Sequence, residues 1–438
     1  FASVRLVDVT IDGPLISASL QCTSYNLFRY DTLVRKGTAR ITDNYLRHYL
    51  EIKKGGLYCQ EIIDEGIPRL EQLSFVEQVR PMQTQFRKNA ADVYLFLKNR
   101  KSNYFAGILG ILPDVSNPGK VRFTGDLELS LLNGFGSGES VYFTWKKYES
   151  LTQRLNTGFN YPYIFKSAVG IDFKMELYRK DTSYLTVNPV YGLCIYNGGG
   201  NFYSLFIDRQ VSSLISKSSL VIDSITLQPI SSFRKTIYGL GTNQIHLNNR
   251  FNPLRGYSII ANAGFGRKIV APADTAFVAS KEFSQAEGKA RINLFLPLSA
   301  HSTMRVGAQS GFLYLTFFSE YDSSDGFFYE NEMMRIGGIH TLRGFDEDAI
   351  LASVYSIFTL EYRYLFEKYS NLFMFCDVAY YEKQGMKFVH DTPVGFGAGI
   401  NLDTKAGIFS LTWALGRQFS NPVELRSAKI HVGFVNRF

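Results

Sequence analysis

The feature that most constrains the fold of this sequence is a strict alternation of apolar and polar residues within short segments. In KVRFTGDLELSLL, residues Val121, Phe123, Leu127, Leu129 and Leu131 share one parity, and charged or hydroxyl-bearing residues occupy the other. Successive side chains of a β-strand point to opposite faces, so this segment forms a strand with one apolar and one polar face. The pattern therefore predicts strands whose two faces meet different environments.

The same alternation recurs from about residue 103 to the end of the chain. It is clear in RINLFLPL (291–298) and in SVYSIFTLEYRYLF (353–366), and turn-forming sequences such as NGFGSGE and YNGGGN separate the segments. We count about sixteen such segments, an even number within the range of transmembrane barrels. The predicted fold class is membrane all-β, an antiparallel transmembrane β-barrel of about sixteen strands.

A soluble β-sandwich, whose apolar faces would share one core, is the alternative. Aromatic residues make up 15% of the chain and many stand near the ends of predicted strands, which favours the barrel. The longest uncharged run, residues 182–207, contains Asn, Pro and three consecutive Gly, which excludes a spanning helix. The formal net charge of +8 is spread along the chain without a basic arm, which argues against a nucleic-acid partner.

The first hundred residues follow a different pattern. Helical spacing appears between residues 42 and 70, with Thr42 or Asp43 placed to cap the first helix and Gly55-Gly56 placed to end it. The segments 28–37, 75–86 and 91–101 are typical of strands, so the predicted order is strand, helix, helix, strand, strand. Residues 1–27 add two strands without helices, which fits the end of a preceding copy of this unit.

Enzyme functions find little support. The six histidines have no metal-ligand spacing, and neither GxSxG nor a P-loop is present, so we expect no catalytic residue, no metal site and no cofactor. The four cysteines form no CxxC pair. The acidic run EYDSSDGFFYENE (320–332) lacks EF-hand spacing, and we expect it to be a solvated extracellular loop.

Several motifs give the chain a resemblance to a known family. The unit containing YLRHYLEIKKGGLY resembles a POTRA domain, and the remainder resembles the barrel of the BamA-type outer-membrane protein assembly family, with relatives in two-partner secretion transporters and the mitochondrial sorting-and-assembly barrel. The match is carried by LRGF (342–345), by Glu361 in TLEYRYLF, by Asp377 in FMFCDVAYY and by NPLRGY (252–257).

The resemblance divides the chain into three parts. Residues 1–27 correspond to the last strands of a truncated preceding POTRA domain, residues 28–101 to a POTRA domain, and residues 102–438 to the barrel with a long loop at 319–350. It also implies that the LRGF segment lies at the tip of this loop and folds back into the barrel. The segment consists of Leu342, Arg343, Gly344 and Phe345.

The residue types indicate what would keep this loop folded into the barrel. A buried guanidinium is costly unless carboxylates pair with it, and the resemblance offers Glu361 and Asp377 on the wall. Glu361 has the parity opposite to apolar Leu360 and Tyr362, so it points inward. Gly344 would let the backbone approach the wall closely. A solvated loop arginine is the alternative, and the lock would be structural.

Parity also gives Asp377 its predicted surroundings. Asp377 shares its face with Phe373, Phe375 and Tyr381, which we expect to form an aromatic bed for Phe345.

The resemblance places function at the seam between the first and last strands, about 103–112 and 428–438. In this family these strands meet with few stable hydrogen bonds, and an imperfectly paired edge is a template for another strand. Asn436 breaks the apolar row of the last strand. The seam residues that we single out are Ile108, Gly110, His431, Gly433 and Phe438.

The predicted function is that of a non-enzymatic assembly factor that folds and inserts nascent β-barrel proteins through this seam. A polypeptide translocase of the two-partner secretion type and a passive pore are the alternatives. The resemblance implies location in the outer membrane of a diderm bacterium, with the POTRA domain in the periplasm. The expected partners are nascent outer-membrane barrels, other subunits of an assembly complex, and outer-membrane lipid, which the basic excess permits to include lipopolysaccharide.

Overall fold

A computed structural model describes residues 2–24, 26–113, 121–147, 152–215, 229–249, 252–271, 281–317, 328–367, 369–385, 387–404, 407–419, 421 and 425–435. The chain divides into two units, Phe1–Arg100 and Lys101–Phe438. Among the described residues, no helix has the length and apolar character needed to cross a membrane.

The first unit begins with a two-stranded antiparallel hairpin, β1 (Ala2–Asp12) and β2 (Leu15–Ser24). Its apolar side chains, including Leu6, Ile11 and Ile16, are exposed. A lone hairpin is marginally stable in water, and exposed apolar residues of this kind are normally covered by another layer. The expectation that these strands complete a preceding module remains a prediction.

The N-terminal module that follows has the predicted βααββ order. Its elements are β3 (Arg29–Lys36), α1 (Asp43–Tyr49), α2 (Gln60–Gln72), β4 (Val76–Arg87) and β5 (Ala90–Asn99). In the three-stranded sheet, β5 lies in the centre, parallel to β3 and antiparallel to β4. Val93 and Leu95 of β5 are buried in the same module core as Leu46 and Leu50 of the α1 region. Burial of each large aliphatic side chain stabilises such a core by about 1.5–3 kcal/mol.

The first helix of this module is shorter than predicted. The hydroxyl of Thr42 accepts a hydrogen bond from the Tyr45 amide and caps the helix, but the helix ends at Tyr49 and not at Gly55-Gly56. The Leu50 amide still donates to the Leu46 carbonyl, and Glu51 then takes a positive φ of 60°. A left-handed residue stops a helix, so this turn ends α1 before the glycines are reached.

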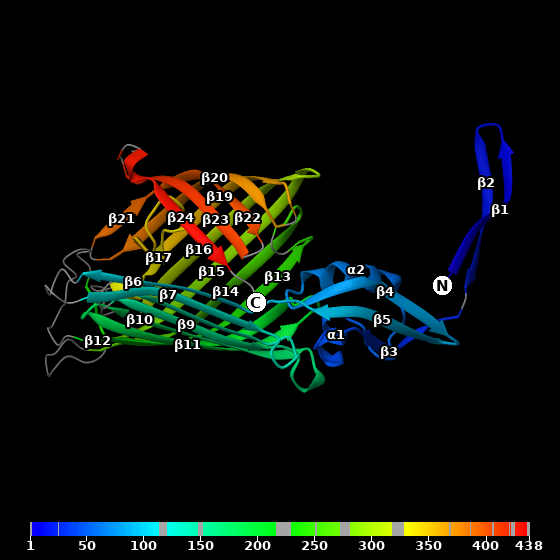
Figure 1. Ribbon diagram of the computed structural model, residues 1–438, viewed down its shortest axis with the longest axis horizontal. Coiled ribbons are helices and arrows are strands. Elements are labelled where there is room, and N and C mark those ends of the chain that lie inside the picture. Colours follow the sequence, from blue (N-terminus) through cyan, green and yellow to red (C-terminus); the bar gives the residue numbers. More distant parts are fainter. Residues whose placement is uncertain are drawn as a thin grey trace. The chain divides into compact units, whose positions relative to one another are not determined.

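The second unit is a closed antiparallel barrel, which confirms the predicted fold class (Figure 1). Its sixteen wall strands are β6 (Tyr104–Pro113), β7 (Val121–Leu132), β8 (Ser140–Lys147), β9 (Gln153–Tyr161), β10 (Val169–Lys180), β11 (Tyr184–Tyr196), β12 (Phe202–Leu214), β13 (Phe233–Leu247), β14 (Gly256–Val270), β15 (Lys281–Ser299), β16 (Ser302–Phe317), β19 (Val354–Leu365), β20 (Asn371–Gln384), β22 (Val394–Thr404), β23 (Gly407–Arg417) and β24 (Lys429–Val435). A short strand, β21 (Phe388–Asp391), pairs with the end of β20.

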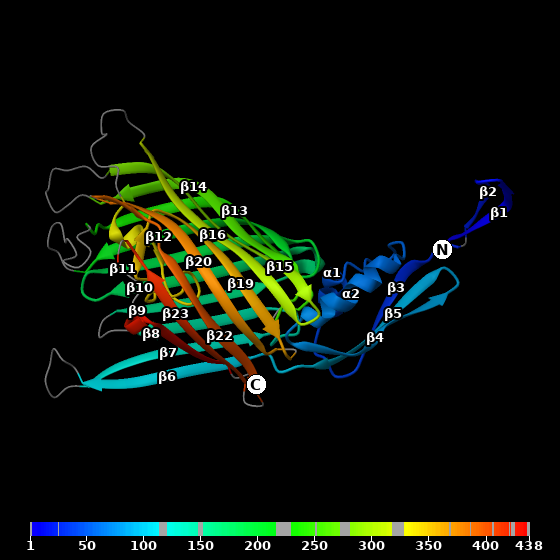
Figure 2. The same cartoon turned by 90° about the horizontal axis from the view of Figure 1, so that it is seen from above.

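The strands follow one another around the wall in sequence order, and the last meets the first. In Figure 2 the cyan strands β6 and β7 lie beside the orange and red strands, where β24 neighbours β6 and closes the barrel. The alternation produces the two faces of the wall. Phe358, Leu360 and Tyr362 of β19 are exposed on the outside, whereas Ile357 and Glu361 are buried inside.

The loop between β16 and β19 ends at Ser353, slightly beyond the predicted end at 350, and residues 318–327 lie outside the described part of the chain. Within it, β17 (Met334–Ile336) and β18 (Ile350–Ala352) pair with each other as a small sheet, preceded by a 3-10 turn at Glu330–Glu332. The longer extent follows from this pairing, because the backbone of β17 gives residues 350–352 a partner before the wall strand begins. The yellow segment that includes β17 lies within the barrel in Figure 1.

Candidate functional site

Arg343, at the tip of the β16–β19 loop, is buried against the inner wall. Its Nε and Nη2 donate to Oδ2 and Oδ1 of Asp377, each at 2.7 Å, and its Nη1 donates to Oε2 of Glu361 at 2.6 Å. The backbone amide of Arg343 also donates to Oδ2 of Asp377 at 3.3 Å. The structure thus brings together the loop arginine and both acids singled out from the sequence, in the two-point geometry that makes such pairs strong.

The two acids are held by further groups on the wall. Glu361 on β19 accepts hydrogen bonds from Arg305 at 3.2 Å and from Arg363 at 2.5 Å, so three guanidinium groups share one carboxylate. Asp377 on β20 accepts a hydrogen bond from the Thr359 hydroxyl at 2.8 Å. Every charge in this cluster has a partner, which is the condition for tolerating buried charges.

Burial alone would lower the pKa of Arg343. The hydrogen bonds and negative charge of Asp377, followed by those of Glu361, outweigh burial, so that the pKa of this loop arginine lies above its usual value. The guanidinium therefore stays charged, and the position of the loop segment depends on the two carboxylates that pair with it.

The backbone next to Arg343 touches the wall. Gly344 has a φ of 93°, and a Cβ added there would lie 2.4 Å from the carbonyl oxygen of Leu415 on β23. A Cβ at Gly395 on β22 would lie even closer to the Arg343 carbonyl oxygen, at 1.9 Å. Glycine is thus required on both sides of the contact.

The aromatic residues of β20 surround the loop differently from the prediction. Phe375 lies beneath the guanidinium of Arg343, 3.5 Å from the ring centroid, and Phe373 belongs to the same small cluster as Phe375. Phe345 instead packs in a larger cluster with Leu342 and Tyr381. The predicted bed for Phe345 is therefore wrong for Phe373 and Phe375, because the arginine lies over Phe375 and both rings belong to a cluster without Phe345.

A second group of contacts fixes the earlier part of the loop to other wall strands. Glu330 pairs with Lys180 of β10 at 2.6 Å, and Glu332 pairs with Lys268 of β14 at 2.6 Å. Asn331 donates at 2.7 Å to both the Ser212 hydroxyl and the Ser231 carbonyl. The expectation of a solvated acidic loop is wrong for these residues, because both glutamates are buried against lysines inside the barrel.

The environment of Lys268 is unusual for a lysine. Its ammonium group lies between 5.2 and 5.8 Å from the ring centroids of Phe233, Phe283, Phe328 and Tyr329. Ring faces attract cations, so they compensate part of the loss of water around a side chain that is 1% exposed. The pairing of Lys268 with Glu332 was not predicted from the sequence. The only signal for it was the presence of a lysine at position 268, within an otherwise alternating strand.

The NPLRGY segment also connects distant parts of the barrel. Asn252 donates to the carbonyl oxygens of Glu367 and Ser370, each at 3.4 Å, and accepts from Asn371 at 3.0 Å. Asn371 in turn accepts from Asn401 at 3.1 Å. The turn before β14 is thus tied to the turn between β19 and β20.

The seam residues are only partly described. Ile108 and Gly110 lie within β6, where they are opposite Asp126 and Thr124 of β7. His431 and Gly433 lie within β24, opposite Thr412 and Ser410 of β23. Phe438 and Asn436 lie outside the described residues.

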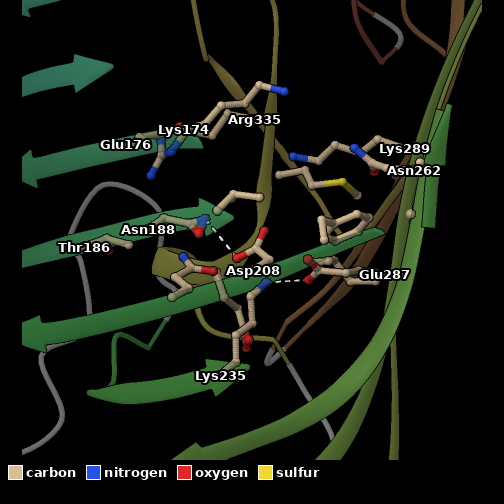
Figure 3. Close-up of a pocket in the computed structure, with 18 of the residues that line it drawn as sticks. Lys174, Glu176, Thr186, Asn188, Asp208, Lys235, Asn262, Glu287, Lys289 and Arg335 are labelled. Carbon is tan, nitrogen blue, oxygen red and sulfur yellow. Dashed lines mark hydrogen bonds and ion pairs between the residues drawn. The ribbon is translucent and has the colours of Figure 1, made fainter. Parts of the chain in front are cut away.

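The barrel also encloses a polar cavity of about 500 Å³ beside the folded-in loop (Figure 3). Wall residues of both charges face it, among them Lys174, Glu176, Asp208 and Lys289, and Arg335 of the loop strand β17 faces it as well. Lys235 pairs with Glu287, and Asn188 donates to Asp208 at 3.1 Å. The arrangement holds charges of both signs within the lumen.

Together these features define a class of protein: a sixteen-stranded antiparallel barrel, preceded by a βααββ module, with a loop anchored inside its lumen. No family model matches the sequence, and no curated protein sequence is significantly similar to it.

Solved structures of similar fold extend over the whole chain. BamA from Haemophilus ducreyi lacking POTRA domains 1–3 is 15% identical with a TM-score of 0.50, and 90% of that chain is covered. CdiB from Acinetobacter baumannii is 12% identical with a TM-score of 0.58 over 78% of that chain, and CdiB from Escherichia coli is 13% identical with a TM-score of 0.57 over 80%. At such identities the likeness establishes the fold, which is common to both kinds of protein.

Proposed function

We propose that this protein is an outer-membrane assembly factor that folds and inserts nascent β-barrel proteins through the seam between β6 and β24. The observation that carries the proposal is the doubly anchored loop. Arg343 fixes one end to β19 and β20, and Glu330 and Glu332 fix the other end to β10 and β14. Because this loop crosses the lumen, it favours a route for client proteins through the wall of the barrel.

The seam offers that route. The described part of β24, Lys429–Val435, neighbours β6 where the barrel closes, and a strand edge at such a closure is a template for another strand. A client strand that adds to this edge satisfies its own backbone groups, each of which costs several kcal/mol if left unpaired in a bilayer. No cofactor is needed, because the pairing itself supplies the driving force.

The rest of the assignment follows from the fold likeness and the apolar outer face. We place the barrel in the outer membrane of a diderm bacterium and the N-terminal module in the periplasm. The partners are nascent outer-membrane β-barrel proteins, other subunits of an assembly complex, and outer-membrane lipid that includes lipopolysaccharide. The LRGF segment and its two acids act as a structural lock that keeps the loop folded in.

The lumen cavity favours a second candidate, a polypeptide translocase of the two-partner secretion type. A polar space of about 500 Å³ lined by both charges would accommodate a passing chain once the loop moved. The anchored loop argues against the third candidate, a passive open pore.

Site-specific photo-crosslinking in cells separates the candidates. A photoreactive residue replaces Ile108 at the seam, Asn262 facing the lumen cavity, or Leu240 on the outer face. The insertase predicts that Ile108 captures the last strands of many different outer-membrane barrels and that Leu240 does not. Capture of a single secreted polypeptide at Asn262, with Ile108 silent, would support the translocase and exclude the seam mechanism.

A further inference from the structure

A second, smaller cavity is lined by Arg343 and by residues of β15, β16 and β19. It has a volume of about 250 Å³, room for roughly eight water molecules. The ionisable side chains that line it are Arg291, Arg305, Arg343 and His340. Within the described part of the chain, none of its lining residues is a carboxylate.

The charges around this cavity do not balance. Arg305, Arg343 and Arg363 all donate to Glu361, and Asp377 is the only other acid in the described cluster. Arg291, on β15, forms no ion pair with any described carboxylate. Four guanidinium groups therefore face two carboxylates, which leaves an excess of positive charge. Arg343 is buried and Arg305 is largely buried, whereas Arg291 is exposed to the water of the lumen.

The arginines are also oriented by neutral partners. Nε of Arg291 donates to the Gln309 side-chain oxygen at 3.2 Å, and Nε of Arg305 donates to the Asn293 side-chain oxygen at 3.0 Å. The Gln309 amide orients Arg291 without neutralising it, so the terminal N–H donors of Arg291 remain for another acceptor, whereas Arg305 also pairs with Glu361. A planar guanidinium fork matches the oxygens of phosphate or carboxylate groups.

We propose that this cavity binds a small oxyanion, of the size and charge of inorganic phosphate. Such an ion would supply the negative charge that the cluster lacks and would accept from Arg291 and Arg305 together. Because Arg343 lines the same cavity and also anchors the loop, a bound oxyanion would hold the loop more firmly. This site does not depend on whether the protein acts as an insertase or a translocase.

The test is titration of the full-length protein in detergent micelles with inorganic phosphate at constant ionic strength. Calorimetry measures binding, and hydrogen exchange of residues 339–343 measures loop protection. We expect saturable binding that Arg291→Gln weakens by about tenfold or more, since a hydrogen bond to a charged group is lost. Glycerol 3-phosphate, titrated in parallel, shows whether the site takes the free ion or prefers a phosphate ester.

Lys289→Gln is the matched control. Lys289 lies two residues from Arg291 on the same strand face, and it lines the larger cavity and not this one. Lys289→Gln removes one positive charge, as Arg291→Gln does. If Lys289→Gln binds phosphate with an affinity within twofold of that of the parent, the result supports the site. Equal binding in the parent and Arg291→Gln, or no saturable effect of either phosphate compound, would overturn the proposal.

Discussion

Arg343 and Asp377 form a two-point ion pair, Nε to Oδ2 and Nη2 to Oδ1 at 2.7 Å each, at a place where Asp377 is 0% exposed. The pair joins the loop to β20, and the one neighbouring carboxylate, that of Glu361, is already shared by Arg343, Arg305 and Arg363. Removing one member of a buried pair leaves the other charge without full compensation.

The Asp377→Asn variant is therefore expected to release the loop. Loss of one buried charge should destabilise the folded-in loop by about 3–5 kcal/mol. Hydrogen exchange of residues 339–348 in the purified barrel measures this as faster exchange of those amides.

Glu282→Gln provides the control for this variant. Glu282 pairs with Arg267 on β14, but that pair is largely exposed, and such pairs contribute about 1 kcal/mol or less. Unchanged protection of residues 339–348 in Asp377→Asn would mean that the ion pair does not hold the loop.

Gly344→Ala tests the close contact with the wall. The added Cβ would lie 2.4 Å from the Leu415 carbonyl oxygen, at a φ of 93° that disfavours other residues. Strain of this kind costs about 1–3 kcal/mol before the clash is counted. We expect the loop amides to exchange faster and the thermal midpoint of the barrel to fall.

A matched glycine separates strain from clash. Gly55 also has a positive φ, 78°, but a Cβ there would meet nothing within 4 Å. Gly55→Ala should show the conformational cost alone. If both substitutions lowered stability equally, the close contact between Gly344 and Leu415 would make no separate contribution to stability.

Much of the barrel could be predicted because a period of two residues is a property of neighbouring positions. Glu361 could be assigned to the lumen from the apolar character of Leu360 and Tyr362 on either side, and the structure places it there. The face of a wall residue follows from local sequence alone.

The surroundings of each loop residue could not be predicted in the same way. Parity gives the face on which Phe375 lies, but it does not say whether Arg343 or Phe345 covers it. Glu332 and its partner Lys268 are 64 residues apart, and Glu330 and Lys180 are 150 apart. Nothing in the acidic run itself distinguishes a glutamate in water from one paired with a distant lysine.

The buried pair of Lys268 and Glu332 gives a prediction in the form of a double-mutant cycle. Lys268→Met leaves the Glu332 carboxylate buried without its cation and should cost about 3–5 kcal/mol. Adding Glu332→Gln removes the unpaired charge, so the double variant should be more stable than Lys268→Met alone.

Hydrogen exchange of residues 328–335 reports this anchor separately from the Arg343 lock. We expect it to change in Lys268→Met while residues 339–343 keep more of their protection. Additive effects of the two substitutions would contradict a direct interaction between the side chains.

The N-terminal module carries a prediction of pH dependence at Asp92 of β5. Burial raises the pKa of Asp92, but its hydrogen bonds from the Arg87 side chain and the Thr32 amide, with the charge of Arg87, together hold it below the ordinary value of 3.8. A lowered pKa in the folded state means that ionised Asp92 stabilises the module above pH 3.8. That stabilisation is lost as the pH falls through the folded-state pKa.

Carboxyl NMR of the full-length protein tests both the direction and its cause. The Asp92 carbon should titrate with a midpoint below 3.8, and Arg87→Gln should move the midpoint upward because it removes the guanidinium and leaves burial in place. The free energy of unfolding of the module should then depend less on pH below 3.8 in Asp92→Asn than in the parent, since the amide does not titrate. A midpoint above 3.8 in the parent would mean that burial outweighs the pair, and the stability of the module would then change with pH in the opposite sense.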